Sequence, residues 1–519
     1  MDMSDVQFDR NWDEFPTGDG LRVLPQAISS SDLQSEKEAP LIIVRKENSS
    51  DNMVQPGWLE NFDLASAQKR YQILATMLII GLQFACAFGN FSVLAFVPLR
   101  DPIEPGSYHP RLVLLFNLVG SVASGIFSDK FGRKMAFDII LMVFMAVCFL
   151  YFSGIVVSFM FYIVIIAFLG GATSTVGAIF ISETMANKMN RGSLIAKQFL
   201  GELFGQLVSM ITIIISSSSV SQKYKDYYFT FDNLLMPEVV ATAAMVVAGY
   251  TYFFWVKRIP ESPRYTYFVW NNSRKAASDA KRLLIREVTN GEEEEATVFQ
   301  NLTFGLFSWE FYNLHGWHLL GVTATSFVNG INYLTQLLFL NLIFHQYALL
   351  VPPSKPELLL FLAMLMTVTT VLGFLCQVFL IDRINRFCIL FACFCIKAVL
   401  MVLVLLETPW KKKDNITELC VYYVLCNIIY NFANATNFVV AAEIFPTRMR
   451  GTCHGITVAG NRLGLFLAII CLFVAGHHFQ LILGFLACIN VIPGIAASFL
   501  VKESKGKTLE DASNEHGLE

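Results

Sequence analysis

Residues 125–134 read GIFSDKFGRK, a short basic stretch between two long apolar runs. A related stretch, QVFLIDRINR at residues 377–386, again follows an apolar run and carries an aspartate followed four positions later by an arginine. The two pairs are Asp129 with Arg133 and Asp382 with Arg386. Such pairs can join neighbouring helix ends by charge-assisted hydrogen bonds in one conformation and release them in another. The recurrence favours two copies of one structural unit over charges that serve only to orient the chain in a membrane.

The composition predicts a membrane protein. The chain has 519 residues, of which 15% are charged, and its mean hydropathy is +0.52. A soluble protein would carry roughly 25% charged residues. Apolar stretches recur along most of the chain at about 20 residues, the length that a helix needs to cross a bilayer. We therefore expect an all-α polytopic membrane protein, and the net charge of −3 gives no reason to expect nucleic acid as a partner.

Apolar runs between polar breaks predict twelve transmembrane helices. They cover residues 72–98, 111–128, 135–156, 160–182, 194–217, 237–256, 318–348, 357–381, 387–406, 418–441, 453–475 and 478–501. The short basic breaks all fall on the side of the long charged stretch 257–316, so the positive-inside rule places that side and both termini in the cytosol. The loop KKKDNIT (411–417) argues against this because it is basic and falls outside, but it also holds a glycosylation acceptor triplet, which suits an outer loop.

These spans divide the chain into five parts. We expect a disordered cytosolic tail at 1–70, a six-helix half at 71–257, a cytosolic central loop at 258–316, a second six-helix half at 317–502 and a cytosolic tail at 503–519. Most of the eleven cysteines fall inside apolar segments and resemble small hydrophobic residues of helices. No cysteine or histidine spacing indicates a metal site or a cofactor.

Several motifs resemble the major facilitator superfamily. GxxxDxxGRK (125–134) and PESPRY (260–265) are typical of it, and three longer stretches are similar to the phosphate:proton symporters of plants and fungi. These stretches are SETMANKMNRGSLIA (182–196), FGLFSWEFYNLHGWHLLGVTATSF (304–327) and AAEIFPTRMRGTCHGITVAGNRLG (441–464). The tail KESKGKTLEDA (502–512) is similar to the end of many sugar-porter-like members. The resemblance covers about residues 70–502 and implies two six-helix repeats around a central cavity lined by spans 1, 4, 7 and 10.

The phosphate-site residues of those symporters do not recur here. In span 7 the positions that match their Trp, Asp and Tyr hold Ser326, Gly330 and Leu334. Their Gly-Gly-Asp-Tyr-Pro run in span 4 corresponds to Gly170-Gly171 followed by Ala-Thr-Ser-Thr, and the acidic pair of their span 1 falls near Ala87 and Asn90. A glutamate, Glu202, replaces their span 5 glutamine, and Arg462 replaces their span 11 lysine. These departures predict weak or no phosphate transport and a different polar or anionic solute.

Polar side chains form stripes within the predicted spans. In span 7 Asn329, Asn332 and Gln336 are spaced three and seven apart, so they share one helix face near Tyr333. Span 10 repeats this pattern with Asn427, Asn431 and Asn434, and span 5 with Gln198, Glu202 and Gln206. Polar groups in a membrane usually line pathways, although single amides also join helices to one another. We assign solute binding to Asn90, Asn329, Asn332, Tyr333, Gln336, Asn431, Asn434 and Arg462.

Two charges fall near mid-membrane. Glu202 lies eleven residues past Arg191, and Arg462 lies twelve residues past Arg450. Glu202 is the expected proton-coupling residue and Arg462 the expected anion ligand, with a structural ion pair between them as the alternative. For Lys197 in span 5 and Lys397 in span 9 we expect snorkelling or a role on an outer helix.

The motifs at the inner ends of the helices supply the expected gate. We assign gating to Asp129, Gly132, Arg133, Asp382, Arg386, Glu183, Arg191, Glu443 and Arg448.

These observations predict a secondary active transporter, not an enzyme, for a small polar solute of anionic character such as inorganic phosphate or an organic anion. We also expect the transporter to couple the solute to protons and to work by alternating access around a site near mid-membrane. A non-transporting sensor or scaffold, or a facilitator for an uncharged solute such as a sugar, remains as the alternative. The expected partners are the solute, protons and the lipid bilayer, in a monomer in the plasma membrane rather than an internal one.

Overall fold

The computed structural model describes residues 109–152, 159–184, 190–219, 259–283, 308–350, 356–406, 416–475 and 479–515, parts of 73–87, and residues 249, 305 and 306. The chain divides into two units, residues 1–55 with 294–300 and residues 56–293 with 301–519, and all described residues belong to the second. Asn90, the expected tail at 1–70 and all of the predicted span 237–256 except residue 249 lie outside the described residues.

The first half of the chain forms helices where apolar runs predict them. They are α3 (His109–Phe131), α4 (Arg133–Phe152), α5 (Phe159–Thr184), α6 (Arg191–Ala196) and α7 (Gln198–Ser219), preceded by an apolar helix at Ala75–Ala87. Predicted span 5 is divided between α6 and α7, which meet at Lys197.

The second half also consists of helices. It contains α12 (Trp317–Ile331), α13 (Tyr333–Leu350), α14 (Pro356–Leu380), α15 (Arg386–Leu406), α16 (Ile416–Glu443) and α17 (Arg450–Ala475). Predicted span 7 is divided at Asn332 between α12 and α13. The last span consists of α18 (Phe479–Ile489), the π-helix η4 (Asn490–Ile495) and α19 (Ala496–Ser498). Pro493 explains the π-helix, because proline lacks the N–H that a regular α-helix needs at that position.

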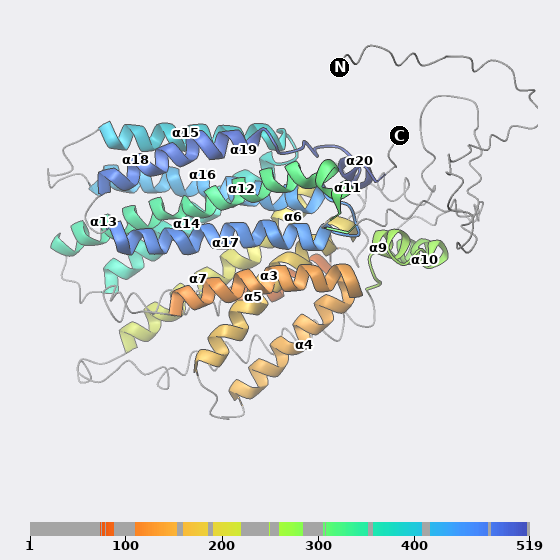
Figure 1. The fold of residues 1–519 in the computed structure, drawn as a ribbon. Coiled ribbons are helices and arrows are strands. Elements are labelled where there is room, and N and C mark those ends of the chain that lie inside the picture. Colours follow the sequence, from red (N-terminus) through yellow and green to blue (C-terminus); the bar gives the residue numbers. More distant parts are fainter. Residues whose placement is uncertain are drawn as a thin grey trace, which may run out of the picture. The chain divides into compact units, whose positions relative to one another are not determined.

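Shorter helices lie at one end of the bundle (Figure 1). They are α9 (Pro263–Phe268), α10 (Ser273–Leu283), α11 (Trp309–Phe311) with the π-helix η3 (Tyr312–Gly316), and α20 (Leu509–Ser513). Ser262 caps α9 by accepting a hydrogen bond from the N–H of Tyr265, and Pro263 occupies the first turn. Thr508 caps α20 in the same way through the N–H of Asp511.

The all-α membrane fold is confirmed for the described residues, whose regular elements are all helices. Within the part of the chain that the structure describes, five helices are long and apolar enough to cross a membrane, at residues 111–131, 164–184, 386–406, 417–443 and 450–471. Each coincides with a predicted span, and large apolar side chains such as Phe149, Phe379 and Leu406 are exposed on the outside of the bundle. A bilayer would cover such side chains. The described cysteines are free thiols in or beside helices.

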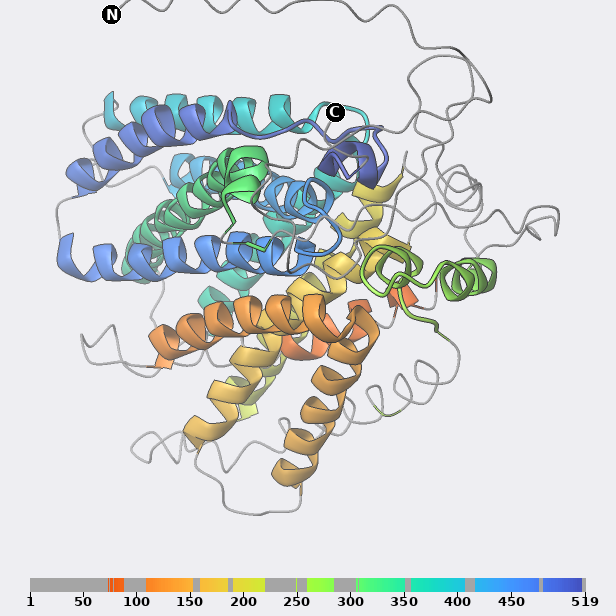
Figure 2. The same cartoon turned by 45° about the vertical axis from the view of Figure 1, so that its right-hand side comes forward.

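The two halves meet where α3 packs along α17 (Figures 1 and 2). Small residues make this approach possible, since a Cβ on Gly125 would overlap the backbone carbonyl of Gly451. Within the second half α12 packs as closely against α17, because a Cβ on Gly330 would overlap the carbonyl of Asn461. In a membrane such close backbone contact supplies the packing energy that the hydrophobic effect supplies in water. The helix α17 is therefore packed between α3 of the first half and α12 of its own half.

Candidate functional site

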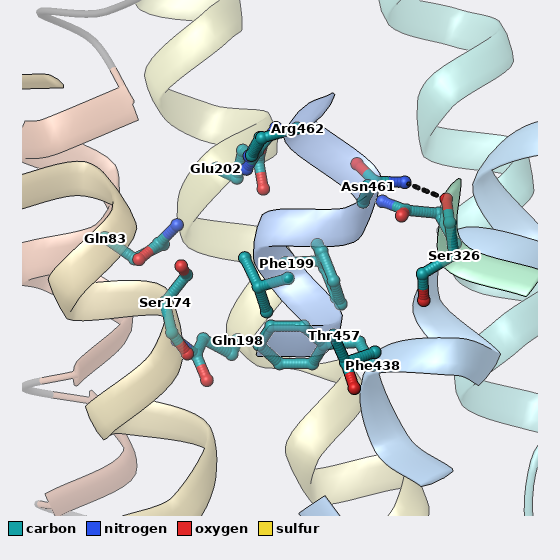
Figure 3. Close-up of a pocket in the computed structure, with 12 residues that line it drawn as sticks. Gln83, Ser174, Gln198, Phe199, Glu202, Ser326, Phe438, Thr457, Asn461 and Arg462 are labelled. Atoms are coloured by element: carbon teal, nitrogen blue, oxygen red, sulfur yellow. Dashed lines mark hydrogen bonds between the residues drawn. The ribbon is translucent and has the colours of Figure 1, made fainter. Parts of the chain in front are cut away.

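A pocket lies between the two halves, and the empty space within and at its mouth amounts to about 470 Å³, part of which is open to solvent (Figure 3). The first half contributes Gln83, Ser174, Gln198, Phe199 and Glu202. The second half contributes Ser326, Asn434, Phe438, Thr457, Val458, Asn461 and Arg462. Most of these side chains are amides, hydroxyls or ions, so the pocket is a polar site enclosed by apolar helices.

Neighbouring helices hold the amides of the pocket but leave some of their polar atoms free. The side-chain nitrogen of Gln198 donates to the carbonyls of Thr173 and Ser174, at 3.3 and 3.2 Å, and Asn461 donates to the carbonyl of Ser326 at 3.2 Å. The side-chain oxygens of Gln83 and Gln198 and the Nε of Arg462 find no hydrogen-bond partner among the described residues. A buried polar group without a partner is costly, so these atoms are suited to bind a polar solute or water.

The two predicted mid-membrane charges lie close together at one end of the pocket. Glu202 extends from α7 and Arg462 from α17, and their side chains converge at one end of the pocket (Figure 3). The positive charge of Arg462 acts on the Glu202 carboxyl, and both side chains are partly accessible. Among the described residues that line the pocket, they supply its charge, because the remaining side chains are neutral.

Aromatic rings close the opposite end of the pocket. The ring of Phe199 stacks on Phe374 at 5.0 Å between centroids and contacts the edge of Phe438 at 4.8 Å. The ring of Phe438 in turn contacts the buried imidazole of His454 at 4.6 Å. Phe199 belongs to the first half, and Phe374 and Phe438 belong to the second, so these rings bring the two halves into contact beside the pocket.

Most of the predicted solute-binding amides lie beside the pocket rather than in its wall. Asn434 and Arg462 line the pocket, whereas Asn90 lies outside the described residues. Asn329 donates to the carbonyl of Tyr430 at 3.5 Å, and the ring of Tyr333 lies 5.7 Å from that of Tyr430. Asn332 is buried and forms a reciprocal amide pair with Asn490, at 2.7 and 2.9 Å, and Gln336 is buried as well. Their solute-binding role stays a prediction.

The span 10 stripe mainly joins helices. Asn427 donates to Thr369 and Thr370 of α14, and Asn431 donates to the side-chain oxygen of Asn427 at 2.9 Å. Asn434, one turn further along α16, reaches the pocket. Asn427 and Asn431 therefore join helices, which was the alternative for single amides. Asn434 lines the pocket, as the cavity hypothesis predicted.

Of the two expectations for Lys397, snorkelling was wrong. Its side chain is 1% exposed and lies inside the second half, where its ammonium group donates to the carbonyl of Asn332 at 3.2 Å. It cannot snorkel, because α15 packs on α16 and α18 along this face and covers the side chain.

A network of buried ions, which we call the latch, joins the helix ends below the aromatic rings. In its first part Glu183 accepts hydrogen bonds from Arg133 at 3.1–3.2 Å and from Arg450 at 3.0 Å. Asp129, at the end of α3, accepts from the N–H groups of Gly451 and Thr452 at 2.9 and 2.6 Å. An aspartate of the first half therefore caps the first turn of α17 in the second half.

The second part of the latch repeats this geometry with the halves exchanged. Asp382, at the end of α14, accepts from the N–H of Ser193 in α6 at 2.9 Å and pairs with Arg386 at 3.2 Å. Glu443 pairs with Arg191 at 3.1 Å and with Arg386 at 3.5 Å. All of these arginine side chains and Glu443 are buried, so the pairs are shielded from solvent.

Two residues in the connections between helices, Glu261 and Gly132, support the latch. Glu261 accepts from the N–H groups of Arg133 and Lys134 at 3.0–3.2 Å, and burial raises the pKa of the Glu261 carboxyl. A Cβ on Gly132, whose φ is +110°, would lie 2.5 Å from the same carboxylate, so glycine is required there.

The C-terminal segment adds two further carboxylates. Arg264 of the PESPRY motif pairs with Glu510 of α20 at 2.7 Å. Burial opposes ionisation of Glu510, but Arg264 holds the pKa of this carboxyl below its ordinary value. Glu515 accepts hydrogen bonds from the N–H and hydroxyl of Thr447, and burial raises its pKa to about 7.

The structure brings the predicted gating residues together with one exception. Asp129, Gly132, Arg133, Glu183, Arg191, Asp382, Arg386 and Glu443 all lie in the latch. Arg448 is exposed, and Arg450, two residues later, pairs with Glu183 instead. Sequence reasoning also missed Glu261, Glu510 and Glu515. The PESPRY motif could have indicated Glu261, and the acidic C-terminal tail could have indicated Glu510 and Glu515. Their role in gating stays a prediction.

Known proteins resemble this chain along most of its length. The sugar (and other) transporter family matches residues 111–516. Low affinity inorganic phosphate transporter 3 of Petunia hybrida is 33% identical over 442 residues, which cover 77% of this chain and 81% of the relative. Inorganic phosphate transporter 1-4 of Arabidopsis thaliana is 32% identical over 466 residues, covering 80% and 86%.

Among solved structures, a proton:xylose symporter of the major facilitator superfamily bound to 6-bromo-6-deoxy-D-glucose superposes with a TM-score of 0.61. The superposition covers 85% of this chain and 98% of the symporter at 16% sequence identity. The likeness confirms the expected fold.

Proposed function

This chain belongs to the sugar (and other) transporter family of the major facilitator superfamily, and we propose that it carries a small anionic solute coupled to protons. It is a secondary transporter and not an enzyme. The observation that carries the proposed solute class is the pocket between the halves, where Arg462 leaves its Nε without a partner beside Glu202 and neutral polar groups.

The two charges of the pocket can link the solute to the proton. When Glu202 is ionised, its negative charge offsets that of Arg462 and repels an incoming anion. When Glu202 binds a proton, Arg462 remains as the positive charge and attracts the anion. Binding of the proton and of the anion therefore favour each other, and linkage makes this preference reciprocal. A transporter that moves only when both or neither is bound is a proton symporter.

Inorganic phosphate is the first solute to test. The curated relatives at 30–33% identity are inorganic phosphate transporters, and the guanidinium group of Arg462 fits a tetrahedral oxyanion through two parallel hydrogen bonds. Ser326, Gly330 and Leu334 nevertheless replace the symporter residues of span 7. We therefore propose a small oxyanion as the solute class, with phosphate carried more weakly than a symporter that retains those residues.

The remaining expectations form part of this proposal. We place the latch and both termini on the cytosolic side, because the basic loops lie there. The halves at 71–257 and 317–502 would then rock about the pocket, with the latch closed in the conformation described. We propose a monomer in the plasma membrane.

An uncharged sugar is the second candidate. The family matched by the chain and the fold of the proton:xylose symporter favour it, as do the amides and hydroxyls of the pocket. Against it stands the charge of Arg462, which a sugar does not require.

Uptake by purified full-length protein in liposomes distinguishes these solutes. Radiolabelled phosphate, sulfate and xylose are offered separately, with and without an inward proton gradient. We expect gradient-dependent uptake of an oxyanion, and we expect Arg462→Gln to lower it at least about tenfold, because a hydrogen bond to a charged group is lost. Arg274→Gln, at an exposed arginine of α10, is the matched control and should transport like the parent.

Two results would overturn the proposal. Saturable xylose uptake without anion uptake would make the protein a sugar carrier. No uptake of any solute by correctly folded protein would favour the non-transporting sensor or scaffold.

A further inference from the structure

The break in span 7 is the starting point. The helix α12 ends at Ile331 and α13 begins at Tyr333, so Asn332 lies between them. In a continuous α-helix its carbonyl would accept from the N–H four residues later. Here it accepts from the N–H and hydroxyl of Thr335, at 3.2 and 2.5 Å, and from the ammonium group of Lys397 at 3.2 Å. A side chain from span 9 thus bonds to the backbone at the point where the regular α-helix of span 7 is interrupted.

Lys397 is an unusual group at this place. Its side chain is 1% exposed, and within the described part of the chain it forms no ion pair with a carboxylate. The ring of Tyr430 lies 5.4 Å from its nitrogen, so a cation–π contact supplements the single backbone carbonyl. A buried ammonium group with so few partners is costly, and such groups inside a membrane protein are a reason to look for a function.

The same break is held from the opposite direction. The side chain of Asn332 forms its reciprocal amide pair with Asn490, the first residue of the π-helix in span 12. Asn490 also donates to the carbonyl of Leu486 at 2.7 Å, so its side chain is held within its own helix as well. Spans 9 and 12 therefore both attach to Asn332 of span 7, one to its backbone and the other to its side chain.

The break connects with the pocket through Tyr430. Its ring contacts Lys397 on one side and lies 5.7 Å from the ring of Tyr333, the first residue of α13. Tyr430 also lies within electrostatic range of Glu202 and Arg462 in the pocket. A movement of α13 about the break would shift Tyr333 against Tyr430 and so alter the wall behind the two charges.

We propose that Lys397 is a positioning residue: its ammonium group holds the break at Asn332 and thereby sets where α13 and Tyr430 stand beside the pocket. It does not touch the solute. Its effect on solute binding rests on the proposed function, whereas its effect on the helix does not.

Hydrogen–deuterium exchange tests the helix part without any solute. Purified full-length protein is compared with Lys397→Met, which keeps the length of the side chain and removes its donors. We expect exchange at residues 328–340 to become at least about tenfold faster, because the local opening free energy falls. Lys397→Arg should behave like the parent. Lys197→Met, at the break between α6 and α7, is the control and should leave this segment unchanged.

A second variant keeps the test informative if Lys397→Met fails to fold. Asn490→Leu removes the amide pair with the side chain of Asn332 and should also accelerate exchange at residues 328–340. Unchanged exchange in that segment, or equal acceleration in every helix, would overturn the proposal.

Transport tests the connection with the pocket. With phosphate as the probe, Lys397→Met should raise KM at least about fivefold while Vmax changes less, and Lys397→Arg should restore KM. A KM like that of the parent despite faster exchange would disprove the link to the pocket. If the parent carries no phosphate, the proposed solute class fails, while the exchange experiment still decides whether Lys397 holds the helix.

Discussion

The carboxylate of Asp129 binds Thr452 through two hydrogen bonds, one from the N–H at 2.6 Å and one from the hydroxyl at 2.7 Å. Asp129 ends α3 in the first half and Thr452 begins α17 in the second, so one side chain joins the halves. Asp382 repeats this contact with the N–H of Ser193. Because each aspartate also pairs with the arginine four residues later, the latch has an approximate twofold symmetry that matches the repeated sequence.

The first prediction is that Asp129→Asn opens the latch. Asparagine keeps one acceptor oxygen but loses the charge that faces Arg133 and the first turn of α17. The loss should cost the closed latch about 1–2 kcal/mol, a shift of roughly 5- to 30-fold in the population of the two states. Insertion of the protein into the membrane should be unaffected. The transport cycle should slow, because the conformation with the closed latch is no longer stabilised.

Two measurements check this prediction. Transport is compared at matched amounts of protein, and the accessibility of a cysteine placed at Thr457 to a reagent applied from the latch side should rise. Glu310→Gln, at an exposed carboxylate outside the latch, serves as the control. Equal transport and equal labelling in Asp129→Asn and the parent would refute the gating role.

The second prediction concerns Gly330. The symporters carry an aspartate at the matching position, but here a Cβ would overlap the carbonyl of Asn461, because α12 packs tightly on α17. Gly330→Ala should therefore destabilise the protein by about 1–3 kcal/mol through overpacking. Restoring the aspartate should cost more and should not restore phosphate transport.

Thermal unfolding of the purified variants measures this effect. Gly484→Ala is the matched control, since nothing lies within 4 Å of the added methyl group in α18 and alanine favours a helix. We expect the midpoint to fall for Gly330→Ala and to stay or rise for Gly484→Ala. A similar midpoint for both variants would show that α12 and α17 can separate.

The third prediction is a pH dependence of the C-terminal segment. Burial raises the pKa of Glu515 to about 7 from an ordinary value of 4.5. The docked segment therefore holds a proton that the undocked segment releases between these two values. Docking is fully favoured below about pH 4.5, weakens as the pH rises, and reaches its lower limit above about pH 7.

Hydrogen exchange of residues 505–515 across this pH range provides the test. The rate in the parent is divided at each pH by the rate in Glu515→Gln, which cancels the intrinsic pH dependence of exchange. The ratio should rise between pH 4.5 and 7, because glutamine keeps its side-chain contacts with Thr447 but cannot ionise. A constant ratio would mean that Glu515 does not control docking.

The fold and the latch could be predicted because their signals are local. A span needs only an apolar run of sufficient length, and the repeated Asp and Arg spacing marks the helix ends directly. The choice between Arg448 and Arg450 failed because two arginines lie two residues apart. Only the start of α17 at Arg450 decides which of them faces Glu183.

The polar residues of the spans were harder to assign because periodicity indicates a shared face but not the neighbour of that face. Asn427 and Asn434 share one face of α16, yet Asn427 contacts α14 whereas Asn434 lines the pocket. Lys397 was misjudged for the same reason. Its carbonyl partner appears only when span 7 breaks at Asn332, and no residue type in the sequence predicts that break.

The last prediction concerns proton coupling. Proton drive needs a carboxyl group that meets the solute and can load and release a proton, and among the described residues that line the pocket Glu202 is that group. Its charge opposes anion binding at Arg462, so an anion can enter readily only when Glu202 is protonated. Glu202→Gln imitates the protonated form permanently. The variant should still bind the anion and exchange it across the membrane, but it can no longer carry a proton with it.

We therefore expect Glu202→Gln to abolish accumulation driven by an imposed pH step while counterflow stays within about threefold of the parent. Both are measured in liposomes with phosphate, or with another anion that the parent accumulates, and Glu310→Gln is the matched control on an exposed carboxyl. Loss of both activities would assign Glu202 to solute binding or to an ion pair with Arg462. Unchanged accumulation would show that a group other than Glu202 couples the anion to the proton gradient, because the glutamine side chain cannot take up and release a proton.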